Sequence, residues 1–272
     1  MNIKLTEKYE RLLQILTSQK HCLIAYSGGV DSTFLLFATR EALGKNACGV
    51  LIDSPFLSKR EKQSALSTAH FFNLPLIIEV VDPFQHHSII ENGPERCYFY
   101  KKFLFETIRA LTEPKGFPVI ADGSNVDDLS LFRPGRKALQ ELGIISPLVS
   151  AGFTKEEIRQ VSRERNLPTW NQPSFSCLAT RIPHGIPISI ERLDRIEKAE
   201  SILFQMGFQQ LRVRDHFPIA RVEIPIQDLT RVLVNGYRHQ VIEGLKSCGY
   251  RWVTLDLEGY HSGNMNEDQE SG

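Results

Sequence analysis

The stretch that decides the fold reads Tyr26-Ser27-Gly28-Gly29-Val30-Asp31-Ser32. An apolar run at residues 21–25 comes directly before it and predicts a buried strand, and a helical pattern that includes Phe34 and Leu35 follows it. A strand, a glycine-rich turn and a helix together form a phosphate-binding geometry, because glycine lets backbone N–H groups approach an anion and the start of a helix is electropositive. We therefore predict a phosphate site here; the plain alternative is a tight turn that binds nothing.

The turn lacks the lysine that ends the Gly-x-x-x-x-Gly-Lys-Ser/Thr loop of P-loop NTPases, which excludes that class of site. Ser-Gly-Gly-x-Asp-Ser resembles instead the PP-loop of ATP pyrophosphatases, which cleave ATP between its α and β phosphates and adenylate a substrate. The ATP-binding residues that this resemblance implies are Ser27, Gly28, Gly29, Val30, Asp31 and Ser32. Asp31 is a candidate catalytic residue and a candidate ligand of Mg²⁺, or else a partner of the loop's own N–H groups.

Three further apolar runs, at residues 47–52, 76–81 and 117–121, alternate with helical patterns and predict strands. Strands that alternate with helices form a parallel sheet with helices on both faces, and ligands bind at the carboxyl ends of its strands. The candidate nucleotide contacts at this edge, besides the PP-loop, are Asp53, Ser54 and Gly123. Asp53 and Ser54 are explained equally well as turn residues that end a strand.

The pattern changes after residue 187, where a helical period and alternating strand patterns predict a smaller unit. We expect a PP-loop ATP pyrophosphatase domain at residues 1–170, a cysteine-bearing loop at 171–186, a substrate-binding or oligomerisation domain at 187–260 and a disordered tail at 261–272. The predicted fold class is α/β, with a parallel sheet of the PP-loop (adenine nucleotide α-hydrolase-like) type and a smaller C-terminal α+β domain.

Composition and charge narrow the function. The chain has 272 residues, of which 42% are hydrophobic and 24% charged, as in soluble globular proteins. Its 32 basic and 32 acidic residues give a formal net charge of zero. This disfavours a nucleic-acid partner, because surfaces that bind a phosphate backbone are usually basic. No stretch is long and apolar enough for a membrane span or a signal peptide, and five cysteines without a Cys-x-x-Cys pair are typical of a reducing compartment. We expect a small-molecule substrate, no nucleic acid, no membrane and a cytoplasmic location.

Cys177 differs from the other cysteines in its surroundings. Cys22, Cys48 and Cys248 lie on or beside apolar runs and are interpreted as small buried hydrophobes. Cys177 lies in a loop among hydroxyl groups with Arg181 nearby, and a neighbouring cation raises the thiolate fraction of a cysteine. From the residues alone, a reactive Cys177 and a structural Cys177 are equally good interpretations.

Two arginines, Arg212 and Arg214, are two apart on a predicted strand and therefore share one face. Two guanidinium groups on one face suit a phosphate or carboxylate ligand. The competing interpretation is a solvated face or salt bridges to acids such as Glu200 and Glu223. The residues alone favour this second interpretation.

One resemblance unites these features. The motifs that carry it, besides the PP-loop, lie at residues 123–128, 133–135, 173–181, 182–185, 211–214 and 254–260. In their order and spacing, from about Lys20 to Asn266, the chain resembles the LarE family of ATP-dependent sulfur transferases. That family acts in the biosynthesis of the nickel-pincer nucleotide, the cofactor of lactate racemase. The cysteine loop and the Leu-Arg-Val-Arg strand are the most specific of these motifs.

The resemblance implies a reaction in two stages. ATP activates a carboxylate of pyridinium-3,5-biscarboxylic acid mononucleotide as an acyl adenylate, and the Cys177 thiolate attacks the acyl carbon and expels AMP. Cleavage of the Cβ–S bond then leaves the sulfur on the product and turns Cys177 into dehydroalanine. Two such events give the bisthiocarboxylic product. An external sulfur donor is the alternative to Cys177.

The same resemblance implies the remaining roles. The implied catalytic residues are Cys177, Asp31 and Glu200, with Glu200 in the sulfur-release step. The implied substrate-binding residues are Arg181, Arg212 and Arg214. ATP and Mg²⁺ are the implied cofactors, and a homo-oligomer is the implied assembly.

Two departures from the family pattern bear on the cofactor and the substrate. Some relatives have a second cysteine where this chain has Tyr100 after Cys97, so the three-thiolate set of an iron–sulfur cluster is incomplete and we expect no cluster. Asn171 and Gln172 stand where the family often has Asp-Lys, which removes two charges near the cysteine.

Other function classes remain as alternatives. A tRNA thiolase is disfavoured by the zero net charge. An amidotransferase-type synthetase needs an ammonia source, and no glutaminase domain fits in this length. A non-catalytic nucleotide-binding module has no need of the cysteine loop.

Overall fold

A computed structural model describes residues 3–112, 114, 116–129, 134–173, 176–234 and 236–261. The chain divides into two compact units, one of Met1–Gln85 with Glu95–Phe175 and one of His86–Pro94 with Ser176–Gly272. The backbone therefore passes between the units three times. Parts of the predicted cysteine loop and of one family motif, namely Ser174, Phe175 and Arg133, lie outside the described residues, as does most of the predicted tail.

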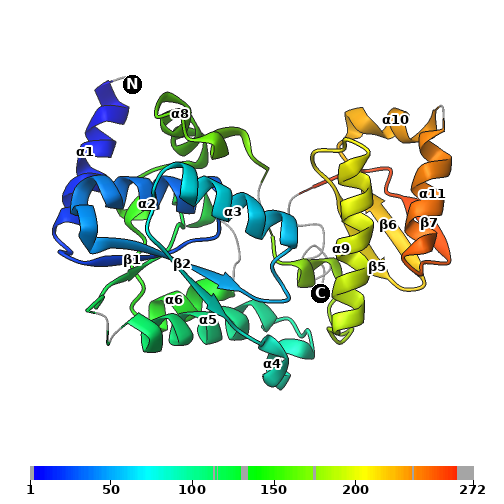
Figure 1. Cartoon of the computed structure of the whole chain (residues 1–272), viewed down its shortest axis with the longest axis horizontal. Helices are drawn as coiled ribbons and strands as arrows, with labels where there is room; N and C mark the ends of the chain where they lie inside the picture. The colour runs from blue at the N-terminus through cyan, green and yellow to red at the C-terminus, as the bar shows by residue number, and fades with distance from the viewer. Residues whose placement is uncertain are drawn as a thin grey trace. The chain divides into compact units, whose positions relative to one another are not determined.

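The first unit is built on a four-stranded parallel sheet in the order β3-β2-β1-β4 (Figure 1). Its strands are β1 (Cys22–Ala25), β2 (Ala47–Asp53), β3 (Leu76–Val80) and β4 (Ile120–Ala121). Ile24 of β1 lies beside Gly49 of β2 on one side and Ala121 of β4 on the other. This sheet confirms the predicted fold class. The strand order turns back at β1 and β4, and ligands of such sheets bind in the crevice at that point.

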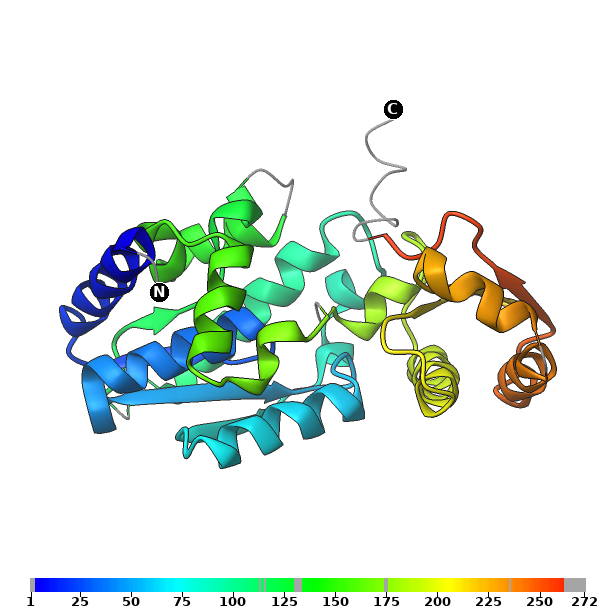
Figure 2. The ribbon, with the colours of Figure 1, turned by 90° about the horizontal axis from the view of Figure 1, so that it is seen from above.

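Helices cover both faces of this sheet (Figure 2). Cys22 and Ile24 of β1 contribute to one core, whereas Leu23 between them contributes to the other, because neighbouring side chains of a strand point to opposite faces. Five helices line the first core: α1 (Ile3–Thr17), α2 (Val30–Leu43), α3 (Lys59–Phe71), α7 (Pro147–Ala151) and α8 (Lys155–Glu164). Two helices line the second core: α5 (Arg96–Thr112) and α6 (Gly135–Glu141). Burial on both faces explains why the strands are continuous apolar runs.

Short 3₁₀ turns connect the elements of the first unit. They are η1 (Gly44–Asn46), η2 (Pro83–Gln85), η4 (Val126–Leu129) and η5 (Pro168–Asn171).

The second unit packs helices against a three-stranded sheet in the order β5-β6-β7. Its elements are α4 (His87–Ile90), η6 (Leu178–Arg181), α9 (Ile190–Gln205), β5 (Arg212–His216), β6 (Ile219–Glu223), η7 (Ile226–Asp228), α10 (Leu229–Leu233), α11 (Tyr237–Ser247) and β7 (Trp252–Leu255). The two stretches whose alternation indicated paired strands are β5 and β6; they pair antiparallel, and β6 pairs parallel with β7. Leu203 of α9, Val213 of β5 and Leu245 of α11 belong to a core of this unit's own.

Residues 86–94 belong to the second unit, although in sequence they lie between two parts of the first unit. Asn92 in this segment is fully buried, and its side-chain amide donates hydrogen bonds to the carbonyls of Ile182 (3.3 Å), Pro183 (2.8 Å) and Ile186 (2.9 Å). The predicted domain boundaries contain no such excursion. The segment 86–94 holds the part of the chain that directly follows η6, through the contacts of Asn92.

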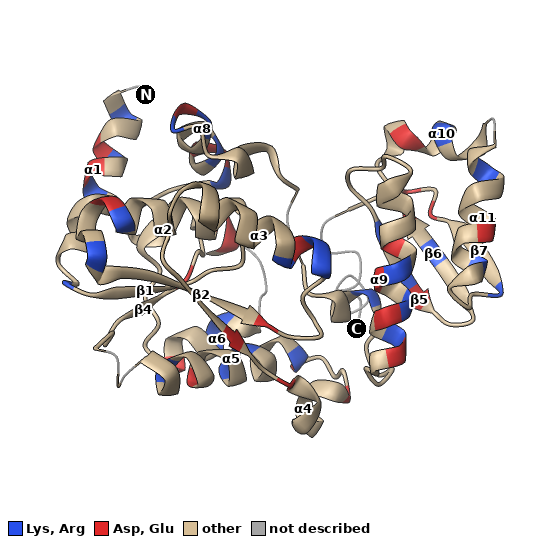
Figure 3. Cartoon of the chain, in the orientation of Figure 1, with Lys and Arg blue, Asp and Glu red and all other residues tan. Residues whose placement is uncertain are grey.

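Among the described residues no helix is long and apolar enough to cross a membrane. Acidic and basic side chains are interspersed along α9, which carries both signs of charge on its exposed surface (Figure 3).

Candidate functional site

The PP-loop joins β1 to α2, and its glycines are required by the backbone. Gly28 has a φ of +77°, and a Cβ on it would lie 2.4 Å from the Cβ of Ala65 in α3. Gly29 is the N-cap of α2, so the first turn of this helix faces the loop. Its leading N–H groups lack partners within the helix, as in anion-binding helix starts.

Two hydroxyl groups close the loop on itself. The Oγ atoms of Ser27 and Ser32 are 3.1 Å apart, and the Ser27 N–H donates to Ser32 Oγ at 3.2 Å. Gly123, at the end of β4, packs against the same place, since a Cβ on it would lie 3.0 Å from the Ser32 nitrogen. The tertiary structure thus brings together the two strand ends that the sequence predicted at one edge.

Asp31, in the first turn of α2, forms an ion pair with Lys155, the first residue of α8. Burial raises the pKa of the Asp31 carboxyl above its ordinary value, and the nearby Lys155 opposes this rise. The other carboxylate oxygen, Oδ1, is buried and has no hydrogen-bond partner among the described residues. A buried, unpartnered carboxylate oxygen beside a phosphate loop has the chemistry of a Mg²⁺ ligand, because Mg²⁺ is usually held by one or two carboxylates together with substrate phosphates.

Lys155 is a candidate functional residue that the sequence reasoning missed. Thr154 and Glu157 form a capping box that starts α8, so from its neighbours alone Lys155 is an ordinary residue of a helix start. The Lys155 N–H also donates to Asp127, at 2.8 Å, which anchors the helix start to η4. Only the contact with Asp31, 124 residues away in sequence, reveals a cation beside the loop.

Asp53 and Ser54, at the end of β2, have the contacts of turn residues. Asp53 forms an ion pair with Lys62 at 2.5 Å. Ser54 Oγ lies 2.7 Å from the hydroxyl of Tyr100 and accepts a hydrogen bond from the Phe56 N–H at 3.3 Å. Tyr100 therefore supports this turn. Nucleotide binding by Asp53 and Ser54 stays a prediction.

The cysteines divide as follows. Cys22 and Cys48 are buried, as predicted, and burial raises the pKa of Cys22 to about 12. Cys248 is only half-buried, which differs from the prediction, because it lies at the end of α11 at the edge of the second unit's core. Cys97 and Cys177 are also half-buried, the first at the start of α5 and the second directly before η6. No group of three or more His, Cys, Asp or Glu that could hold a metal is found within the described ranges.

The turn that carries Cys177 is held by a buried ion pair. Glu200 of α9 binds Arg181 through both oxygens, at 2.9 Å to Nε and 3.1 Å to Nη2. The third nitrogen of Arg181, Nη1, donates to the carbonyls of Ser176 (2.8 Å) and Cys177 (3.1 Å) and to the hydroxyl of Thr180 (3.1 Å). Arg181 is only 1% exposed. It therefore orders the cysteine turn from within the unit, and its predicted substrate contact is not tested.

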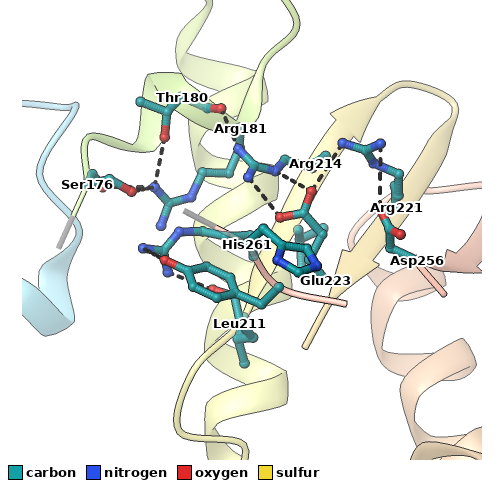
Figure 4. A network of polar contacts seen from close by, with 12 residues as sticks. Ser176, Thr180, Arg181, Leu211, Arg214, Arg221, Glu223, Asp256 and His261 are labelled. Atoms are coloured by element: carbon teal, nitrogen blue, oxygen red, sulfur yellow. Dashed lines mark hydrogen bonds and ion pairs between the residues drawn. The ribbon is translucent and has the colours of Figure 1, made fainter. Parts of the chain in front are cut away.

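A second buried pair holds the other end of the turn (Figure 4). Arg214 of β5 binds Glu223 of β6 through Nε (2.9 Å) and Nη2 (2.7 Å), and its Nη1 donates to the carbonyl of Thr180 at 2.9 Å. Arg221 binds the same Glu223, at 3.1 Å. The salt-bridge interpretation thus describes Arg214 in this structure.

Arg212, on the same strand, is arranged differently. Its guanidinium carbon lies 5.1 Å from the centre of the Tyr260 ring, and its Nη1 donates to the carbonyl of Leu211 at 2.7 Å. Its Nη2 lies 3.4 Å from the hydroxyl of Tyr260. Arg212 is only 6% exposed, and its predicted contact with the substrate is not tested.

Several known proteins are similar to this chain in sequence. No model of a protein family matches the chain. An uncharacterized protein of Synechocystis is 36% identical over 262 residues, which cover 96% of this chain and 98% of that protein. The pyridinium-3,5-bisthiocarboxylic acid mononucleotide synthase of Lactiplantibacillus plantarum is 31% identical over 264 residues, which cover 97% of this chain and 95% of that enzyme. A GMP synthase of Gloeobacter violaceus is 26% identical over 256 residues, but these cover only 45% of its length.

Proposed function

The chain belongs to the LarE family of PP-loop ATP-dependent sulfur transferases, and from this premise we propose that Cys177 is its sulfur donor. The proposed substrate is pyridinium-3,5-biscarboxylic acid mononucleotide, and the proposed product is its bisthiocarboxylic form. The name of the Lactiplantibacillus plantarum relative supports this choice. The reaction would supply the nickel-pincer nucleotide of lactate racemase, in the cytoplasm and in a homo-oligomer.

The first stage is adenylation at the PP-loop. The start of α2, with Gly28, Gly29 and Ser32, binds the phosphates of ATP, and Lys155 adds a cation beside them. These groups stabilise the charge that develops on pyrophosphate as it leaves. Adenylation turns a carboxylate oxygen, a poor leaving group, into AMP, which is a good one.

Mg²⁺ fits this site through Asp31. Its buried Oδ1, which has no partner in the described part of the chain, would hold the ion together with phosphate oxygens. The ion supplies neutralisation of phosphate charge.

The second stage belongs to Cys177. Its thiolate attacks the adenylated carbonyl, AMP leaves, and a thioester forms. Cleavage of the Cβ–S bond then frees the thiocarboxylate. Arg212 and Arg214 bind the phosphate or carboxylate of the substrate. Glu200, whose two oxygens hold Arg181, acts in sulfur release as a positioning residue for the cysteine turn.

The observation that carries the proposal is the anchoring of the Cys177 turn by Arg181 and Glu200. A nucleotide-binding module has no use for a half-buried thiol on a turn held by a buried ion pair. A GMP synthase-type activity is the second candidate class, but the chain covers less than half of that relative.

The mass of the intact protein after turnover tests the sulfur donor. With ATP, Mg²⁺ and the pyridinium substrate, we expect the protein to lose the mass of one H₂S, with dehydroalanine at Cys177 in the peptide map. An unchanged protein mass after a sulfur-bearing product has formed would mean an external donor.

The nucleotide products test the first stage separately. We expect AMP and pyrophosphate, abolished in Asp31→Ala. Formation of ADP and phosphate would contradict adenylation.

A further inference from the structure

The backbone carbonyl of Cys177 is surrounded by an unusual number of donors. Its oxygen accepts from the Thr180 N–H at 2.9 Å, from the Thr180 hydroxyl at 2.7 Å and from Arg181 Nη1 at 3.1 Å. The start of a 3₁₀ turn requires only the first of these, the bond from residue i+3. A carbonyl oxygen has two lone pairs, so a third donor, and a charged one, exceeds what a neutral carbonyl needs.

Arg181 Nη1 shares its two N–H bonds among four acceptors, namely the carbonyl (2.8 Å) and hydroxyl (2.7 Å) of Ser176, Thr180 Oγ1 (3.1 Å) and the Cys177 carbonyl (3.1 Å), so the Thr180 hydroxyl is the nearest side-chain donor to this carbonyl. Arg181 Nη1 donates to Thr180 Oγ1 at 3.1 Å, so the Thr180 hydroxyl has its own proton available for the Cys177 oxygen. Arg181 is in turn held by both oxygens of Glu200. Hydrogen bonds linked in such a chain strengthen one another, most of all where water is excluded.

We propose that Thr180 and Arg181 form an oxyanion hole for an enolate at Cys177. This inference rests on the proposed function, because it concerns the step in which the acylated cysteine loses its sulfur. The Cα–H bond of Cys177 breaks, its proton passes to water, and its electron pair moves onto the Cys177 carbonyl oxygen as an enolate. When the enolate collapses, the Cα=Cβ bond forms and the Cβ–S bond breaks, and the sulfur leaves with the electron pair as the thiocarboxylate. No oxidant or reductant is needed.

The acidity of the carbon explains why the donors are needed. The Cα–H of a peptide residue is a very weak acid, and negative charge appears on the carbonyl oxygen only as the proton leaves. Donors that already surround this oxygen bind the enolate more strongly than the neutral carbonyl, which accelerates the step. Thr180 and Arg181 are thereby assigned to sulfur release, a step separate from adenylation and from thioester formation.

The test follows the two stages separately in Thr180→Val, which keeps the branched shape and the N–H but removes the hydroxyl. Release of AMP reports adenylation and attack, the mass of the acylated Cys177 reports the thioester, and dehydroalanine reports sulfur release. Removal of one oxyanion-hole donor typically slows the step by about 10²–10³-fold. We therefore expect Thr180→Val to accumulate the thioester at Cys177, and Thr180→Ser, which restores a hydroxyl, to relieve that accumulation.

Thr254→Val is the matched control. Thr254 also donates its hydroxyl to a backbone carbonyl of the second unit, that of Ala220 at 3.1 Å, but it belongs to β7 rather than to the cysteine turn. This variant should show the wild-type ratio of thioester to dehydroalanine.

The outcomes distinguish this inference from the proposed function. If the wild-type protein forms product without a thioester or dehydroalanine at Cys177, the proposed function fails. If both form but Thr180→Val releases sulfur at the wild-type rate, only the oxyanion hole is overturned. Protein prepared with Cα-deuterated cysteine gives a second readout: sulfur release in Thr180→Val should show a primary isotope effect, and its absence would also overturn the inference.

Discussion

Gly28 has two reasons to be glycine, and each can be measured. Its φ of +77° is unfavourable for any side chain, and a Cβ would collide with Ala65. We expect Gly28→Ala to lower the free energy of unfolding by about 2–4 kcal/mol, because strain and overpacking add, and to abolish ATP binding. Chemical denaturation and calorimetric titration with ATP measure the two effects.

Gly143→Ala separates those two reasons. Gly143 has a φ of +62°, yet a Cβ on it would have no neighbour within 4 Å. This variant should lose only about 1 kcal/mol and bind ATP normally. If the two variants lose the same free energy of unfolding, the predicted collision with Ala65 does not contribute to the destabilisation of Gly28→Ala.

Cys22 should resist alkylation throughout the ordinary pH range. The thiolate is the reacting form, and a pKa of about 12 leaves a thiolate fraction of about 10⁻⁴ at pH 8. Iodoacetamide labelling of the native protein, read by peptide mass, should therefore modify Cys177 and leave Cys22 intact until the protein unfolds. Labelling of Cys22 at the same rate as Cys177 would contradict its burial.

Among the elements, α8 places Lys155 beside Asp31, and its N-terminal cap fixes where this helix begins. Thr154 accepts the N–H of Glu157 at 3.3 Å, and the helix that it starts carries Lys155 to Asp31. We expect Thr154→Ala to cost about 1 kcal/mol of stability and also to raise the KM for ATP, because the start of α8 loses its anchor. Steady-state kinetics and thermal unfolding measure the two effects.

Ser58→Ala is the matched control for the cap. Ser58 caps α3 in a similar way, accepting from the Glu61 N–H at 3.2 Å, but α3 does not carry Lys155. It should lose similar stability with an unchanged KM. A raised KM in both variants would mean that stability alone, and not the position of Lys155, sets ATP binding.

The molecule as a whole consists of two units, and the chain crosses between them three times. Asn92 lies in the segment 86–94 of the second unit and stabilises that unit. Asn92→Ala removes the donor to three carbonyls and places alanine at a φ of +58°. We expect a loss of about 3 kcal/mol or more, because buried carbonyls are left without partners. Hydrogen exchange should rise at Gly185 and Ile188, whose N–H groups bond to Asn92 and Ile90.

Asn166→Ala provides the comparison. Asn166 has the same φ of +58° but is exposed, so this variant should lose only about 1 kcal/mol. If the two variants lose the same amount, the amide contacts of Asn92 contribute nothing.

The predictable part of this protein is the part encoded by neighbouring residues. The strand–turn–helix around Ser27–Ser32, the alternation of strands and helices, and the paired strands around Arg212–Arg214 were all readable, because each depends on periodicity or on glycine within a short window. Cys177 was singled out by its neighbours. These signals were enough for the fold class, and the relatives of known sequence confirm the family.

The polar contacts around the candidate site residues join parts of the chain that are far apart in sequence, so only folding brings them together. Lys155 meets Asp31 across 124 residues, and Asn92 meets Pro183 across 91. The pairing of Arg181 with Glu200 depends on how α9 packs beside η6. A single hydrogen bond between distant residues produces no periodic pattern in one sequence, because each partner taken alone is a polar residue of a common type. The sequence by itself therefore determined the sheet and the PP-loop and made Cys177 a candidate, because these signals lie within short windows, and packing determined which charges stand beside them.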